Sequence, residues 1–128
     1  MNIYIDADAF VRFEKREFDL PGWLEQRPGD SFIFPATVWQ QLLFGVYAWE
    51  PARASKRLRG LEALGLPVAS FSRRQAALAA RIAAELKTVG IGFSDCQVAA
   101  CVLGDGGELL TFNTRHFSRV PGLRLAQV

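Results

Sequence analysis

The chain opens with a short apolar run that ends in two carboxylates. Residues 1–5 read Met-Asn-Ile-Tyr-Ile, and Asp6 and Asp8 follow directly behind them. β-Branched and aromatic residues in a run of this length favour a strand, which can lie at the centre of a sheet. In open α/β sheets, ligands bind in the crevice beyond the carboxyl ends of the strands. The acids that end this strand are therefore candidates for chemistry, and the rest of the chain decides which side chains join them.

Short strand-like runs alternate with helical patterns along the remaining sequence. This alternation, without repeats or a linker, predicts an α/β fold with a central parallel sheet flanked by helices. Further strands are expected at residues 31–34, 67–71, 108–112 and 123–126. Helices are expected at residues 9–15, 21–26, 36–49, 52–64, 73–87 and 95–103.

Length and composition predict one compact domain over residues 1–128. Half of the residues are apolar, which is enough to build a core. The net charge of +2 is compatible with a polyanionic partner but is far from that of a dedicated nucleic-acid binder. No apolar run approaches the roughly 20 residues of a spanning helix, and the start lacks the layout of a signal peptide, so we expect a cytoplasmic protein with no membrane partner. Cys96 and Cys101 lie about 140° apart around a predicted helix, which predicts free, buried thiols.

Several side chains are expected to shape the helices locally. Asp8, Ser72 and Ser94 are placed to cap the helices that follow them. Gly45 costs about 1 kcal/mol relative to alanine inside a helix, so its presence indicates close packing. In the basic helix at residues 52–64, the inward side chains are expected to be Leu58, Leu61 and Leu64. The outward ones are expected to be Arg53, Lys56, Arg57 and Arg59, either as a solvated face or as an RNA contact.

Four segments carry a resemblance to a known family. They are Asp6, residues 41–45 (Gln-Leu-Leu-Phe-Gly), residues 94–100 with Ser-Asp at their start, and residues 111–117 (Thr-Phe-Asn-Thr-Arg-His-Phe). In this order they resemble PIN-domain nucleases, and among these the small VapC-like toxins of toxin–antitoxin operons, over essentially the whole chain. The resemblance implies a PIN-like three-layer fold with a central parallel sheet of about five short strands. It also implies an acidic pocket, Mg²⁺ or Mn²⁺, and endonucleolytic cleavage of RNA.

Phosphodiester cleavage calls for such a pocket on chemical grounds. A water must be activated and charge on the phosphoryl group stabilised, which hard divalent cations held by oxygen ligands can do. The resemblance implies that Asp6 and Asp95 are direct metal ligands, and that Asn113 stands where relatives carry either a fourth acid or an asparagine. Asp8 and Thr111 would support them. Asp6 and Asp95 also have a plain structural interpretation, as a strand-end turn residue and a helix-start acid.

Gln41 is the departure from the family pattern. Active relatives carry a glutamate at this catalytic position, and here its neutral amide replaces it. The gross attraction lost between a carboxylate and a divalent ion about 4 Å away is roughly 8 kcal/mol at an effective dielectric constant near 20, before desolvation is subtracted. An amide oxygen can still bind magnesium, and Asp8, Glu14 or Glu17 can restore charge. We expect weak or absent nuclease activity in this chain.

Two other functions compete with this interpretation. The opening strand with Asp6 and Asp8 also resembles haloacid-dehalogenase phosphatases, in which the first acid attacks phosphorus. However, Phe10 replaces the expected threonine, and Asp105 lies between a predicted helix and a strand, where it reads as a turn residue. His116 has no serine or cysteine partner for a hydrolytic triad, which leaves it a structural turn or a phosphate contact. The second alternative is an inactive PIN fold that binds RNA or protein.

The resemblance also implies partners. They are a second copy of the chain in a homodimer, an RNA substrate, and a cognate antitoxin whose C-terminal segment lays apolar and acidic side chains into a groove. Candidates to line that groove, unless they pack in the core, are Trp39, Phe44, Tyr47 and Trp49. Candidates to guide the RNA backbone are Arg73, Arg74 and Arg115.

Overall fold

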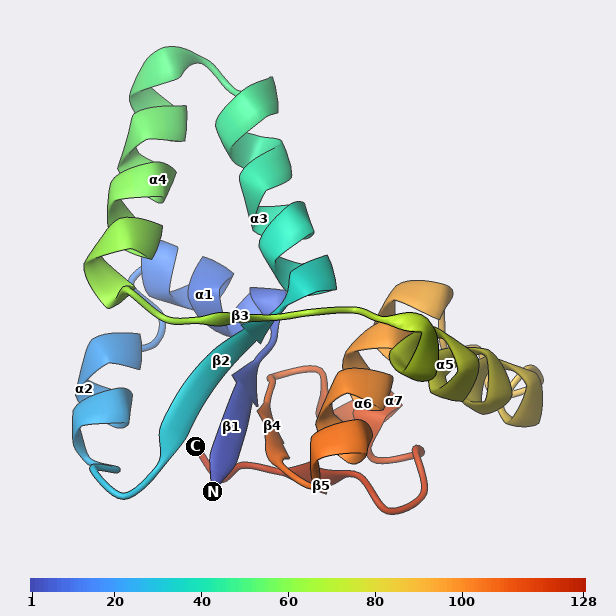
Figure 1. Cartoon of the computed structure of the whole chain (residues 1–128). Helices are drawn as coiled ribbons and strands as arrows, with labels where there is room; N and C mark the ends of the chain where they lie inside the picture. Colours follow the sequence, from blue (N-terminus) through green and yellow to red (C-terminus); the bar gives the residue numbers. More distant parts are fainter.

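A five-stranded parallel sheet lies at the centre of the computed structural model, which describes all 128 residues (Figure 1). The strand order is β3-β2-β1-β4-β5, so the opening strand is central, as predicted. The strands are β1 (Asn2–Ile5), β2 (Ser31–Pro35), β3 (Val68–Ala69), β4 (Glu108–Leu110) and β5 (Arg124–Leu125). The α/β fold with a parallel sheet of short strands is therefore confirmed.

The register of β1 fixes which side chains meet at the end of the sheet. Tyr4 pairs with Ile33 of β2, and Ile5 pairs with Leu110 of β4. Successive β1 residues are buried although they point to opposite faces, so both faces of the sheet are covered. The residues that follow β1 and β4 therefore come side by side at one edge.

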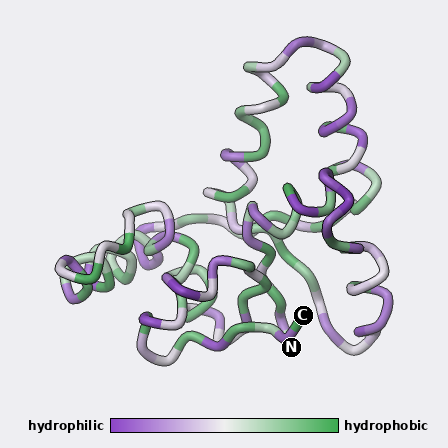
Figure 2. The backbone as a smooth tube through the Cα atoms, turned by 180° about the vertical axis from the view of Figure 1, so that it is seen from behind, coloured by the Kyte–Doolittle hydropathy of each residue, from purple (hydrophilic) through white to green (hydrophobic).

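Seven helices surround the sheet. They are α1 (Ala7–Glu14), α2 (Leu20–Glu25), α3 (Ala36–Ala48), α4 (Pro51–Leu64), α5 (Arg73–Glu85), α6 (Phe93–Asp105) and α7 (Thr114–Phe117). Helices α3 and α4 form an antiparallel hairpin that projects from the sheet, and the two termini lie close together (Figures 1 and 2). No helix is long and apolar enough to cross a membrane.

Helix α6 supplies much of the core. Its residues 98–102 are all buried, and Cys96 is buried just before them. Cys96 and Cys101 are both free, as predicted, and burial raises the pKa of each thiol. These cysteines are therefore packing residues in this fold.

Two of the three predicted helix caps are wrong. Helix α1 starts two residues earlier than expected, so Asp6 is its cap and accepts a 2.8 Å hydrogen bond from the backbone N–H of Ala7. Helix α6 starts at Phe93 after Gly92, which places Ser94 inside the helix. The cap at Ser72 is confirmed, with Gln75 accepting from its backbone N–H.

Most of the predicted inward and outward residues of α4 are confirmed, with Leu61 buried, but two adjacent residues are reversed. Arg57 is only 7% exposed, whereas Leu58 is 37% exposed, so both predictions are wrong. The buried stripe runs through Ala54, Arg57 and Leu61, which lie on one side of a helix at i, i+3 and i+7. Arg57 tolerates burial because Glu14 of α1 pairs with it.

Gly45 sits at the tightest point of the hairpin, which confirms its predicted packing role. A Cβ atom there would lie 2.7 Å from Nη1 of Arg57 and 2.8 Å from the ring of Trp49. Real Cβ atoms do not approach other atoms this closely. Only glycine therefore fits at this position of α3, where the side chain of Arg57 from α4 packs against it.

We expect Gly45→Ala to lower the free energy of unfolding by about 1–3 kcal/mol, because the added methyl displaces Arg57 or Trp49. Gly104→Ala is the matched control, since α6 has open space at that position. It should raise the free energy of unfolding by about 0.5–1 kcal/mol through helix propensity alone. Urea denaturation of both variants measures the difference. Equal stabilisation by the two substitutions would contradict the packing role.

Candidate functional site

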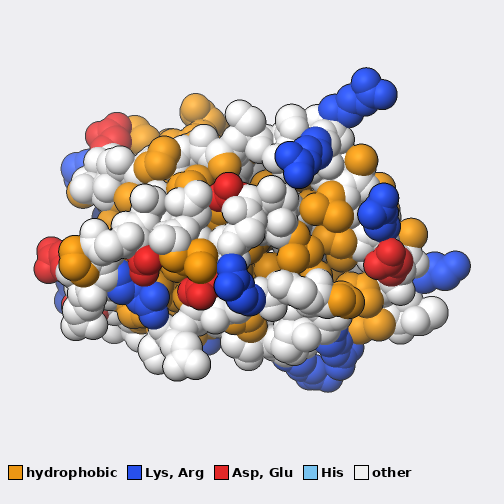
Figure 3. Space-filling view, turned by 60° about the horizontal axis from the view of Figure 1, so that its bottom comes forward, with side chains coloured by type: hydrophobic (Ala, Val, Ile, Leu, Met, Phe, Trp, Pro, Cys, Tyr) orange, Lys and Arg blue, Asp and Glu red, His pale blue; other side chains and the backbone are white.

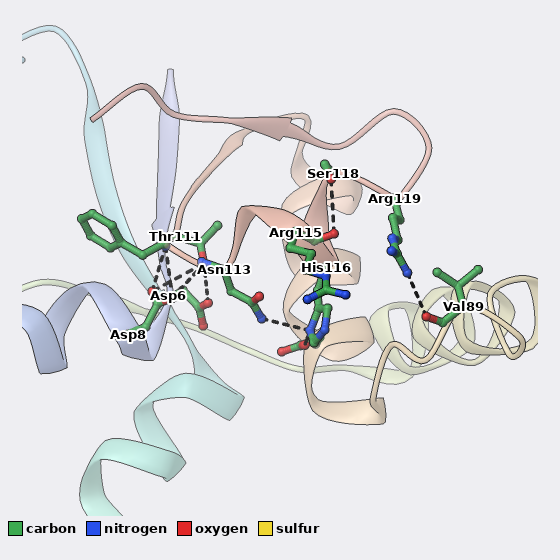
Figure 4. Close-up of polar contacts among 11 residues, drawn as sticks. Asp6, Asp8, Val89, Thr111, Asn113, Arg115, His116, Ser118 and Arg119 are labelled. Atoms are coloured by element: carbon green, nitrogen blue, oxygen red, sulfur yellow. Dashed lines mark hydrogen bonds and ion pairs between the residues drawn. The ribbon is translucent and has the colours of Figure 1, made fainter.

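Asp6 and Thr111 lie side by side at the carboxyl ends of β1 and β4 (Figure 4). The backbone N–H of Asp6 donates to the carbonyl of Leu110 at 3.0 Å and so continues the ladder between the two strands by one residue. The hydroxyl of Thr111 then donates to Oδ2 of Asp6 at 2.8 Å. Both side chains are buried, so the carboxylate is held in one orientation by its neighbours.

Asp8 joins this pair from the first turn of α1. Its carboxylate accepts hydrogen bonds from the backbone N–H of Phe112, at 3.1 and 3.2 Å to its two oxygens. The hydroxyl of Thr111 lies 3.3 and 3.4 Å from the same two oxygens. Because that hydroxyl has one proton, it serves Asp6 through the shorter bond and lies within reach of Asp8. Two carboxylates therefore share one small polar pocket.

The electrostatics of this pocket disfavour two bare negative charges. Burial raises the pKa of Asp6 from its ordinary 3.8 to about 6, and the charge of Asp8 acts in the same direction. The hydrogen bonds from Thr111 and Ala7 oppose that rise in part. Burial also raises the pKa of Asp8, against the hydrogen bond from Phe112. A cation placed between the two carboxylates would relieve both effects.

Asn113 and His116 lie beside the first group (Figure 4), and together with Asp95, which contacts His116, they form a second polar group. Nδ1 of His116 lies 3.5 Å from Oδ2 of Asp95 and 3.2 Å from Nδ2 of Asn113. This nitrogen either donates to Asp95 or accepts from Asn113, depending on whether it carries a proton. The charge of Asp95 also contributes to the raised pKa of Asp6, which places the two groups in one electrostatic neighbourhood.

The sequence interpretation missed the link between His116 and Asp95. The signal available for it was the three-residue spacing of Asn113 and His116, which puts both on one side of a short helix. Nothing in the sequence pointed from that helix to α6, because the contact joins segments about 20 residues apart. The packing of α7 against α6 creates it.

Gln41 lies outside both polar groups. Its side chain is exposed on α3 and makes no hydrogen bond, either with Asp6 or with any other residue. Of the acids considered as substitutes for the missing charge, Glu14 is paired with Arg57. Asp8 is the only one of them that the structure brings to Asp6.

The donor atoms in the pocket suit a hard divalent cation. No group of three or more His, Cys, Asp or Glu side chains is close enough together to hold a metal ion by itself. Mg²⁺ binds in proteins through one or two carboxylates and otherwise keeps waters or substrate oxygens. Asp6 and Asp8, held by the hydroxyl of Thr111, meet that requirement. The residues present therefore fit Mg²⁺ or Mn²⁺.

A groove of about 790 Å³ runs between α1, α3 and α4, with Gln41 on its wall. Phe44 and Trp49 line it, as expected of groove residues, and Phe44 is 70% exposed. Trp39 packs against Phe34 instead, with ring centroids 5.8 Å apart. Tyr47 is 82% exposed and lies outside the groove. The cationic lining residues are Lys15, Arg16, Arg53, Lys56 and Arg57.

Charged side chains also lie on other faces of the molecule. At the amino ends of the strands, Figure 3 shows acidic and basic side chains interspersed over the surface. Arg73 and Arg74 are exposed at the start of α5, and Arg115 is exposed on α7. None of these three guanidinium groups makes a hydrogen bond or an ion pair, and their role in guiding RNA stays a prediction.

Comparisons with known proteins found a matching family model and solved structures with the same architecture. The PIN domain family model matches residues 3–123. A chain of VapBC2 from Rickettsia felis, bound to a DNA fragment from their promoter, has the same fold with a TM-score of 0.86 and 21% identity, covering 98% of each chain. VapBC-1 from nontypeable Haemophilus influenzae gives 0.83 and 20%, over 99% of this chain and 98% of that one. FitAcB from Neisseria gonorrhoeae gives 0.76 and 20%, over 97% and 96%. No curated protein matches the sequence.

The raised pKa of Asp6 predicts a pH-dependent stability. Between about 3.8 and about 6 the folded state binds more protons than the unfolded chain, so the free energy of unfolding falls as the pH rises through this window. Above it, ionised Asp6 lowers stability by about 3 kcal/mol. In EDTA, we expect Asp6→Asn to be more stable than the native chain near pH 8, with the advantage lost near pH 4.

Urea denaturation at the two pH values measures this effect. Glu62→Gln, at an exposed position on α4, is the control and should leave both stabilities unchanged. If Asp6→Asn lowers stability by the same amount at both pH values, the carboxylate is not destabilised by burial.

Proposed function

This chain belongs to the PIN domain family, and on that basis we propose that it is a metal-dependent endoribonuclease, the toxin of a toxin–antitoxin system. The observation that carries the proposal is the pair Asp6 and Asp8, held by Thr111 at the carboxyl end of the central strand. Burial raises the pKa of both carboxylates, and the charge of Asp8 raises that of Asp6 further, so a divalent cation between them would balance charge that the pocket disfavours. The likeness of the fold to VapBC and FitAcB chains supports the same assignment.

Asp6 and Asp8 would hold the Mg²⁺ or Mn²⁺ ion, with Asp95 completing the acidic side of the pocket. When bound, the ion stabilises charge on the phosphoryl group and lowers the pKa of an attacking water. The protein keeps the ligands in place: Thr111 fixes Asp6, and the backbone N–H of Phe112 fixes Asp8. His116 restrains Asp95 from the side of α7.

By resemblance to active relatives, two neutral amides reduce the negative charge available to the metal ion. Gln41 replaces the glutamate of active relatives, and Asn113 stands where some relatives carry an acid. The carboxylates left to balance the metal ion are therefore Asp6, Asp8 and Asp95. We therefore expect weak nuclease activity in this chain, because fewer carboxylates bind the metal ion less tightly, and it is the ion that stabilises the negative charge on the phosphoryl group.

We expect Gln41→Glu to raise RNA cleavage by about tenfold or more with Mn²⁺ or Mg²⁺, and EDTA to abolish the gain. Gln40→Glu is the matched control, since it adds the same charge one residue earlier on the same exposed helix. It should leave cleavage unchanged. The measurement is cleavage of several RNA pools by the three proteins.

Two outcomes would change the proposal. Equal metal-dependent cleavage by the native chain and Gln41→Glu would mean that Asp8 already supplies the charge assigned to residue 41. Cleavage by neither protein on any RNA pool would favour the second candidate, a PIN fold that binds RNA or protein without cutting.

The same proposal includes a homodimer and an antitoxin that occupies the groove between α1, α3 and α4. Phe44 and Trp49 offer apolar surface there, while Lys15, Arg16 and Lys56 offer positive charge. A segment with apolar and acidic side chains would match both features. The exposure of Phe44 supports this, because a large aromatic side chain at the surface is stabilised when a partner covers it.

We expect Phe44→Ala to weaken binding of a candidate antitoxin C-terminal peptide by about 2 kcal/mol, because it removes a central aromatic contact. Tyr47→Ala, three residues further on, removes an even more exposed aromatic ring outside the groove and should leave affinity unchanged. Isothermal titration calorimetry gives the affinities. No complex by size-exclusion chromatography, or equal losses for both variants, would count against this groove.

A further inference from the structure

Arg12 is an exposed arginine that lies about one helical turn beyond Asp8 on α1. Residues four apart on a helix are neighbours on one face, separated by about 6 Å along its axis. Burial raises the pKa of the Asp8 carboxyl, and the positive charge of Arg12 is among the influences that lower it again. The guanidinium group is therefore close enough to the pocket of Asp6 and Asp8 to act on its charge.

The ring of Phe112 holds this guanidinium group in place. The Cζ atom of Arg12 lies 4.4 Å from the ring centroid of Phe112. Phe18 packs edge-on against the same ring, with the two centroids 5.1 Å apart, so the ring itself is fixed. The backbone N–H of Phe112 donates to the carboxylate of Asp8. One residue thus orients Asp8 through its backbone and Arg12 through its side chain.

The N–H groups of Arg12 have no partner in the protein. Its guanidinium group stacks on Phe112 and makes no ion pair and no hydrogen bond, whereas the guanidinium group of Arg57 is paired with Glu14. A guanidinium group that stacks on a ring still presents its N–H donors at its edge, and their fork matches two oxygens of one phosphate. Arg12 is therefore a fixed cation with free donors at the border of the acidic pocket.

We propose that Arg12 is a phosphate-binding residue of the site: its guanidinium group binds the RNA backbone beside the carboxylates of Asp6 and Asp8. The inference rests on the proposed function. The two carboxylates suit a metal ion and repel a bare phosphate, whereas Arg12 attracts the phosphate. Arginine side chains beside bound metal ions commonly hold phosphoryl groups in this way.

A purely structural role for Arg12 makes a different prediction. If Arg12 served only to keep Asp8 ionised and in position, its loss would weaken metal binding. A phosphate-binding Arg12 acts on the two ligands differently, because its positive charge repels a metal ion and attracts RNA. Its removal should then leave the Mn²⁺ affinity unchanged or raise it, while the RNA affinity falls. Measuring both ligands on one variant separates the two roles.

The test compares Arg12→Gln with the native chain near pH 8. Titration calorimetry gives the Mn²⁺ affinity, which should not fall. Fluorescence anisotropy with a short labelled oligouridine at saturating Mn²⁺ gives the RNA affinity, which should fall about tenfold at low salt. The slope of log affinity against log salt concentration should become shallower by about 0.7, as expected when one contact to a single strand is lost. Gel electrophoresis checks that the RNA stays intact during the measurement.

Arg59→Gln is the matched control, because it removes the same charge from an exposed arginine on α4 outside the groove. It should leave both affinities and the salt slope unchanged. Arg12→Lys keeps the charge but lacks the planar fork, so it should keep the salt slope and recover only part of the RNA affinity. Both positions are exposed, and circular dichroism checks that the variants fold.

Unchanged RNA binding in Arg12→Gln would overturn the role of Arg12 and leave the proposed function standing. A fall in Mn²⁺ affinity that accounts for the lost RNA binding, or an equal loss in Arg59→Gln, would also overturn it. No Mn²⁺-dependent RNA binding by the native chain would overturn both inferences. A short oligoglutamate peptide tests the other kind of anion. If Arg12→Gln weakens binding of this peptide and not of oligouridine, Arg12 holds a carboxylate of a protein partner and the phosphate role is wrong.

Discussion

Pairing of the first strand with neighbours on both sides is the constraint on which the site depends. Because β1 bonds to β2 and β4 in parallel, the ends of distant chain segments meet at one edge of the sheet. The residue after Ile5 then lies beside the residue after Leu110, and Asp6 meets Thr111. A slip of the register by one residue would turn these side chains to opposite faces and separate them.

The pocket at this edge holds the carboxylate of Asp6 in a buried position, where burial disfavours its negative charge. Asp6 caps α1 and also accepts a hydrogen bond from Thr111, so it serves folding and the candidate site together. Neither contact fully offsets its loss of hydration, and its pKa stays near 6. Asp8 adds a second charge next to it. Functional sites commonly hold such groups. The buried negative charge destabilises the empty protein, and a cation that neutralises this charge binds more tightly because it removes that cost.

The hairpin of α3 and α4 extends the site beyond the sheet. It carries residue 41, the exposed Phe44 and most of the cations that line the groove. Its position depends on close packing between Gly45 and Arg57. Because Gly45 has no side chain, the guanidinium group of Arg57 fits against the backbone of α3. That contact holds the two helices of the hairpin together beside the groove proposed for a protein partner.

The sequence by itself indicated the five strands, six of the seven helices and the central position of β1, because hydrophobic periodicity and strand length are local properties, whereas the four-residue helix α7 is too short to show a period. It also indicated Asp6 and the tight packing at Gly45, since each has a local signature. Only the tertiary structure decided that Arg57 turns inward, that Trp39 joins the core while Phe44 stays exposed, and that His116 meets Asp95. These three features depend on which helices pack against each other. The sequence of a helix shows which of its residues form an apolar stripe, but it does not show which other element packs against that stripe.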